Sequence, residues 1–136
     1  MKASSISFQA AVLLVIMGMG WGIIMAISED HTTMPAHAHL NLLGWVSLFL
    51  FGIFYHLHPA IDLSRSAMVQ VCVWIISTIG LTLGVAMIHR GNHLGDPIAA
   101  VASVLALLDM ILFSWLVYRR DVNTLDARDP FAVPAE

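Results

Sequence analysis

The chain is predicted to be an all-α integral membrane protein, an up-and-down bundle of four transmembrane helices. Of its 136 residues, 59% are hydrophobic and 11% are charged, whereas soluble domains carry about 25% charged residues. Four long apolar runs alternate with short polar connections. Runs of this length favour helices, and no alternation of polar and apolar residues suggests a transmembrane barrel.

The spans follow from the length of each apolar run, since a helix needs about 20 apolar residues to cross a bilayer. The predicted spans cover residues 8–27, 36–57, 67–88 and 97–118. They form one domain, residues 1–120, and a polar C-terminal tail follows, residues 121–136. The first run is longer than the apolar part of a signal peptide, so we expect it to be kept as a span.

The connections between the spans are short, which predicts antiparallel neighbours. Asp96 and Pro97 resemble an N-cap followed by proline in the first turn, and Pro35 opens the second span in the same way. Most basic residues fall on one face of the bundle: Lys2, Arg65, Arg119, Arg120 and Arg128. The positive-inside rule therefore predicts that both termini lie in the cytoplasm. We expect the protein in a bacterial-type inner (plasma) membrane.

Composition also limits the partners. A formal net charge of −3 and the lack of a basic run give no reason to expect nucleic acid, so the expected surroundings are membrane lipid. The single cysteine, Cys72, excludes an internal disulfide and a multi-cysteine metal site. Because a four-helix protomer has a thin interior, we expect a homo-oligomer.

Glycines mark where helices approach each other closely. Gly80 and Gly84 form a small-xxx-small pair, which we expect at contacts within or between protomers. Gly18, Gly20 and Gly22 thin the first span. Two roles are open for these glycines: plain helix packing, or room for a flat macrocycle between the helices.

Five of the seven histidines fall on the predicted periplasmic face: His31, His37, His39, His89 and His93. His56 and His58 fall on the opposite face. Histidine is a common metal ligand and is costly inside a bilayer. His39 and His89 lie just inside the apolar layer on antiparallel spans. We therefore expect them at similar depth on facing helices, as the two axial ligands of a haem would be. His93 and His37 are the next candidates, and a ligand from a neighbouring protomer is another.

Two other interpretations stay open. The outer residues His31, Met34, His37 and His93 offer imidazole and thioether ligands, which suit copper, and the imidazoles also suit zinc. Alternatively, the histidines are interfacial polar groups of a structural accessory subunit without a cofactor.

One stretch resembles a known family. His39-Leu40-Asn41-Leu42-Leu43, then Gly44-Trp45 and Tyr55-His56-Leu57-His58-Pro59, is similar to the second helix of haem-copper oxidase large subunits, above all the nitric oxide reductase branch. In that family the histidine binds the low-spin haem b, so the resemblance implies that His39 is a haem ligand. The resemblance covers only residues 39–59. The spacing from histidine to proline is one residue shorter, and His56 replaces an aromatic residue.

The rest of the family's machinery has no counterpart in this sequence, since neither an HPEVY-like motif nor an adjacent histidine pair is present. The resemblance therefore implies a haem b site without a complete oxygen- or nitric oxide-reducing centre, and whether the chain is an enzyme stays undecided. Two histidine ligands would favour electron transfer, with a respiratory-chain redox partner, and a single ligand would favour binding of a gas.

Asp109 is the other notable residue, because it lies near the middle of the fourth span among apolar neighbours. A carboxyl group at this depth usually faces an interior or a partner. We expect a neutral acid bonded to Ser77, Thr78, Ser47 or Ser114. It is either a proton relay, a helix or oligomer contact, or simply a satisfied carboxylic acid without a functional role.

Overall fold

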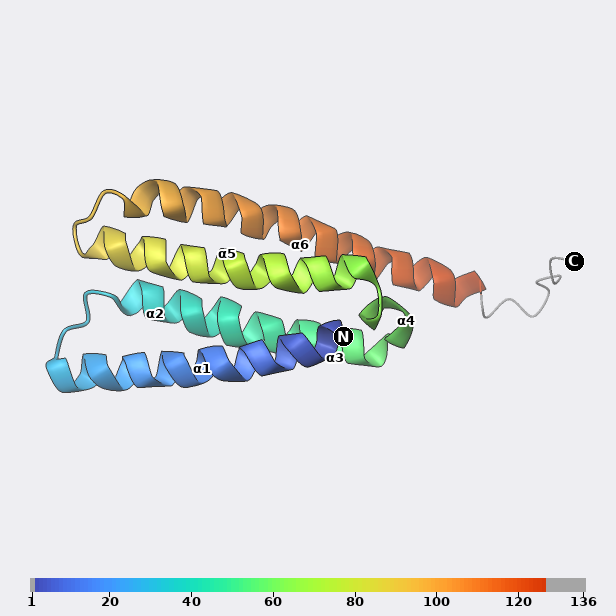
Figure 1. Ribbon diagram of the computed structural model, residues 1–136, viewed down its shortest axis with the longest axis horizontal. Coiled ribbons are helices and arrows are strands. Elements are labelled where there is room, and N and C mark those ends of the chain that lie inside the picture. Colours follow the sequence, from blue (N-terminus) through green and yellow to red (C-terminus); the bar gives the residue numbers. More distant parts are fainter. Residues whose placement is uncertain (1, 127–136) are drawn as a thin grey trace, which may run out of the picture.

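A computed structural model describes residues 2–126, with side chains described for residues 2–119. Over this range the chain is helical apart from short connections (Figure 1). Its elements are α1 (Ala3–Ser28), α2 (Met34–Asn41), the π-helix η1 (Leu42–Ser47), α3 (Leu48–Leu57), α4 (Pro59–Asp62), α5 (Arg65–His89) and α6 (Gly95–Asp126).

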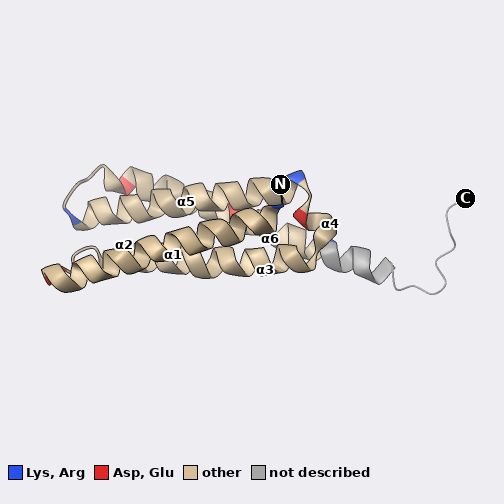
Figure 2. Cartoon of the chain, turned by 60° about the horizontal axis from the view of Figure 1, so that its bottom comes forward, with Lys and Arg blue, Asp and Glu red and all other residues tan. Residues whose placement is uncertain are grey.

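Within residues 2–126, four helices are long and apolar enough to cross a membrane, as predicted. They are Ala3–Ser28, the continuous segment Met34–Leu57, Arg65–His89 and Gly95–Arg119. The N-terminal end of α1 and the C-terminal end of α6 lie at the same end of the bundle (Figure 1). Lys, Arg, Asp and Glu lie mostly at the two ends of the bundle (Figure 2), which fits an apolar middle in lipid.

Several boundaries differ from the predicted ones. α1 begins at Ala3, five residues before the predicted start of the first span. The connection between the second and third spans contains a short helix, α4, whose first residue is Pro59. α6 begins one residue before the predicted cap Asp96. It also continues through Asp126, well into the predicted tail, and the rest of that tail, residues 127–136, lies outside the described residues.

The first two spans pack through glycines that face bulky side chains. The contacts follow a regular antiparallel register: Phe8 with Gly52, Leu14 with Gly44, Asn41 with Gly18 and His37 with Gly22. A Cβ atom at Gly52 would lie 2.7 Å from the Phe8 ring, and one at Gly18 would lie 2.5 Å from the Asn41 amide. Side chains of the second span thus fill the space beside Gly18 and Gly22, so these glycines serve helix packing and leave no room for a macrocycle.

α5 and α6 also pack through glycine. A Cβ atom at Gly84 would lie 2.6 Å from the backbone nitrogen of Ala99, and one at Gly80 would lie 3.2 Å from the Ala102 Cβ. The small-xxx-small pair therefore lets α6 approach α5 within one protomer. Of the two expected uses of this pair, the structure shows the one within a protomer.

Aromatic side chains of α3, α5 and α6 pack against one another inside the bundle. Phe51 of α3 packs edge-on against Trp74 of α5, with ring centroids 5.0 Å apart. Its ring is tilted against that of Phe113 of α6, with centroids 4.4 Å apart. Trp74 is 3% exposed, and its indole nitrogen donates to the Leu43 carbonyl. This bond joins α5 to the π-helix of the second span, which directly follows the histidine segment.

Candidate functional site

The histidine segment of the second span is followed by an irregular turn of helix. α2 carries His37 and His39, and the π-helix η1 begins directly after Asn41. A π-turn leaves carbonyl groups without regular helical partners and often occurs at functional sites. Here Leu42 O accepts from the Ser47 hydroxyl and Leu43 O accepts from the Trp74 indole. These two hydrogen bonds hold the backbone of Leu42 and Leu43, which directly follow the histidine segment.

His39 is half-buried and has one ring nitrogen fixed. Its Nδ1 lies 2.7 Å from the backbone carbonyl of Pro35, one turn earlier in α2. Because a carbonyl oxygen only accepts, this bond assigns the proton to Nδ1 and leaves a lone pair on Nε2. That is the tautomer of a histidine that ligates a metal through Nε2 while a backbone carbonyl orients its ring.

His37 has a different environment, because it faces α1. Its ring carbon Cε1 lies 3.1 Å from the position of a Cβ atom at Gly22. The Asn41 amide lies 3.3 Å from each ring nitrogen of His37 and donates to the His37 carbonyl at 2.9 Å. His37 and Asn41 thus fill two neighbouring glycine notches of α1, which gives His37 a packing role.

His89 ends α5, and its ring is exposed. The contact between Gly44 and Thr78 sets the antiparallel register of the second and third spans. A helix rises about 1.5 Å per residue. His39 therefore lies roughly 7 Å beyond Gly44, toward the histidine-rich end of the bundle, and His89 lies roughly 16 Å beyond Thr78 toward the same end. The two histidines share one end of the bundle, as predicted, but the expected similar depth is not found. The assignment of His89 as a ligand stays a prediction.

The remaining outer candidates lie on the surface. His31, Met34 and His93 are exposed, and the His93 side chain lies 3.9 Å from the Asp96 carboxylate. Within the described residues, no three His, Cys, Asp or Glu side chains come close enough together to hold a metal ion. The copper or zinc interpretation therefore stays a prediction without a preformed ligand group.

The connection between α1 and α2 is held by hydrogen bonds among its own residues and with α1. Thr32 donates from its hydroxyl and from its backbone N–H to the Asp30 carboxylate, which holds the pKa of Asp30 below its usual value. The Trp21 indole nitrogen donates to the Thr33 hydroxyl at 3.1 Å. Trp21 thereby ties α1 to the residue that precedes α2.

The cavity whose lining includes a sequence neighbour of His39 is small for a haem. An apolar cavity of about 270 Å³ lies beside α1, lined by Leu13, Leu14, Met17, Trp21, Leu40, Ile79, Thr82 and Leu83. Its wall includes Leu40, the residue after His39, but no histidine. Ligand pockets usually span about 300–1,000 Å³, so this cavity is small for a macrocycle. His39 offers a suitable donor atom, and a haem bound to it would need a second chain to enclose it.

A second polar group lies in the other half of the bundle and joins three helices. The Tyr55 hydroxyl of α3 donates to Oε1 of Gln70 on α5 at 2.7 Å, and Nε2 of Gln70 donates to Oδ2 of Asp109 on α6 at 2.8 Å. All three side chains are at least 97% buried. The expected partners of Asp109 are wrong, because Ser77, Thr78, Ser47 and Ser114 make no hydrogen bond to it. The sequence reasoning missed Gln70, although an isolated amide in an apolar run is the signal that could have indicated this bond.

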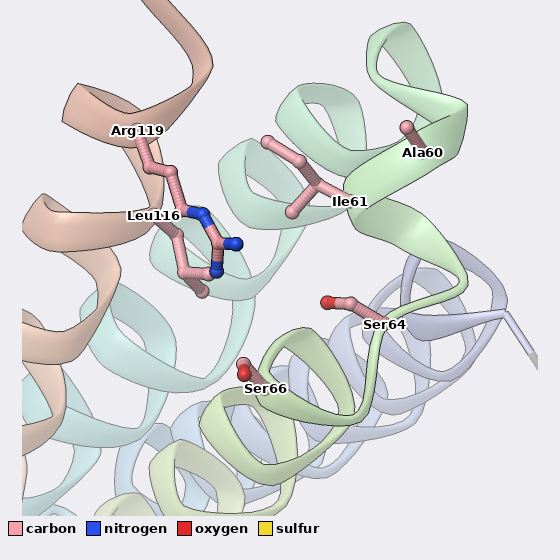
Figure 3. A pocket seen from close by; sticks show the side chains of 6 residues that line it. All are labelled: Ala60, Ile61, Ser64, Ser66, Leu116 and Arg119. Atoms are coloured by element: carbon pink, nitrogen blue, oxygen red, sulfur yellow. The ribbon is translucent and has the colours of Figure 1, made fainter. Parts of the chain in front are cut away.

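The other buried carboxyl group caps α1. Asp62 of α4 accepts from the backbone N–H of Ser4 and from the Ser4 hydroxyl, both at 2.7 Å. A small cavity of about 180 Å³ lies nearby, between α4, the start of α5 and α6. Figure 3 shows the Arg119 side chain extending from α6 toward Ser64 and Ser66. No predicted ligand lines this cavity.

Comparisons with known proteins give no relative. No family model, no curated protein and no solved structure matches the chain.

Proposed function

We propose that the protein is a membrane haem b protein in which Nε2 of His39 is an axial ligand of the iron. The observation that carries this proposal is the hydrogen bond from His39 Nδ1 to the Pro35 carbonyl, which leaves Nε2 unprotonated. The resemblance of residues 39–59 to haem-ligating helices supports the same residue. Of the five outer histidines, His39 combines partial burial with a free ring nitrogen.

The second axial ligand is best supplied by a second copy of the chain. His37 packs against Gly22, and His89 lies roughly 9 Å further out than His39 by the helical rise. A two-fold axis beside α2 would place His39 of each copy on opposite sides of one iron. Two imidazole ligands would close the iron to gases, which favours electron transfer over gas binding.

The orientation proposed for this site in the membrane follows from the distribution of basic residues. We propose that the end of the bundle with His39 faces the periplasm and that both termini lie in the cytoplasm of a bacterial-type cell. Basic residues at the opposite end, including Lys2, Arg65 and Arg119, support this orientation. An electron would then be exchanged with a respiratory partner at the outer membrane surface.

An absorption spectrum of the purified protein, combined with haem extraction, tests this proposal. The proposal expects a Soret band, reduced-minus-oxidised bands of a low-spin b-type haem, and one haem for every two chains. One haem per chain would contradict the shared site. Protein expressed with adequate haem that shows no Soret band would contradict haem binding altogether.

A further inference from the structure

Asp109 differs from the other buried carboxyl group of the bundle, Asp62, in how its oxygens are bonded. Both residues are 3% exposed. Asp62 accepts at both oxygens, from the backbone N–H and the hydroxyl of Ser4 at the start of α1. Among the residues with described side chains, Asp109 accepts only from Gln70, at Oδ2, and its buried Oδ1 has no partner.

Among the side chains that the structure describes, no basic residue near Asp109 would balance a carboxylate. α5 contributes Gln70, and between Arg65 and His89 it carries no charged residue. α3 contributes Tyr55, whose hydroxyl proton is directed at Gln70 and not at Asp109. Along α6 the next basic residue is Arg119, about 15 Å away by the helical rise.

We propose that Asp109 is a proton-binding site inside the membrane, with its exchangeable proton on Oδ1. The direction of the hydrogen bonds supports this assignment, because Oδ2 accepts from an N–H group as the carbonyl oxygen of a carboxylic acid does. Oδ1 is then the hydroxyl oxygen. Its proton is not held by an acceptor among the described residues, so it is free to transfer to water or another acceptor that reaches it. Asp62 differs from Asp109, because both of its oxygens accept hydrogen bonds at the N-terminus of α1.

Infrared spectroscopy of the full-length protein in lipid tests the site without reference to any haem. The wild-type protein at neutral pH should show the C=O stretch of a protonated carboxylic acid. The band should shift when all aspartates carry ¹³C at the carboxyl group, and it should shift again in D₂O. Asp109→Asn should remove it, and the matched variant Asp62→Asn should leave it.

A third variant tests the role of Gln70. Gln70→Leu should keep the band but move it to higher frequency, because the carbonyl oxygen loses its donor. No such band in the ¹³C-labelled wild-type protein would show an ionised Asp109 and overturn the proposal, even if the variants failed to fold. A band that persists unchanged in D₂O would show a permanently held proton and would overturn the assignment as an exchange site.

Discussion

Gln70 is the only described residue that donates a hydrogen bond to the side chain of Asp109, at 2.8 Å. The same amide accepts from Tyr55 at 2.7 Å, so one side chain links α3, α5 and α6. The ring of Phe113, one helical turn after Asp109, packs against the rings of Tyr55 and Phe51. The network thus couples the position of α6 to the rest of the protomer.

Replacing Gln70 should destabilise the protein. Gln70→Leu leaves the Tyr55 hydroxyl and the Asp109 carboxyl group without their partner, and unpaired buried polar groups cost about 1–3 kcal/mol. Thermal unfolding in detergent should show a lower midpoint. The double variant Gln70→Leu/Asp109→Leu should recover part of this loss. The matched control Gln9→Leu changes an exposed glutamine of α1 and should not lower the midpoint; an equal effect at both positions would count against the network.

Gly84→Ala should weaken the packing of α6 on α5. The added Cβ would lie 2.6 Å from the backbone nitrogen of Ala99, which cannot rotate away. Overpacking of this kind costs about 1–3 kcal/mol. Gly20→Ala is the control, because no atom lies within 4 Å of its new Cβ, and it should stabilise α1 by about 0.5–1 kcal/mol. Unfolding midpoints of the two variants that move in the same direction would contradict this packing.

Asp62→Ala should loosen the start of α1. The change removes the acceptor for the backbone N–H and hydroxyl of Ser4, and loss of a helix cap costs about 0.5–2 kcal/mol. Hydrogen exchange should become faster at the first turn of α1 while the outer half of α1 keeps its protection. Ser5→Ala is the control, since Ser5 is exposed. Unchanged exchange at Ser4 in the Asp62 variant would rule out a capping role.

The sequence was sufficient to predict the spans, because hydropathy depends on composition alone and the bilayer sets the length. It also led to the segment from Pro35 to His39, where proline opens the helix and histidine follows one turn later. The π-helix η1 could not be predicted, since it depends on bonds from Trp74 and Ser47 rather than on local propensity.

Contacts between helices were harder to predict from the sequence than the spans themselves. Glycine spacing indicated close packing, but only the register shows that His37 occupies the notch at Gly22 and that His89 is not level with His39. Asp109 could be recognised as unusual from its apolar neighbours. Its partner depended on which face of α5 meets α6, and periodicity in a helix that is apolar on nearly every side does not reveal that face.

The measurement that tests the central claim most directly is the absorption spectrum of His39→Ala beside that of His58→Ala. The two histidines make a matched pair, because both are half-buried and each has Nδ1 on the carbonyl four residues earlier, at opposite ends of the second span. The account predicts that His39→Ala loses the low-spin Soret band and most of the bound haem, and that His58→Ala keeps both. Retention of the wild-type spectrum by His39→Ala would contradict the assignment of His39 as the haem ligand.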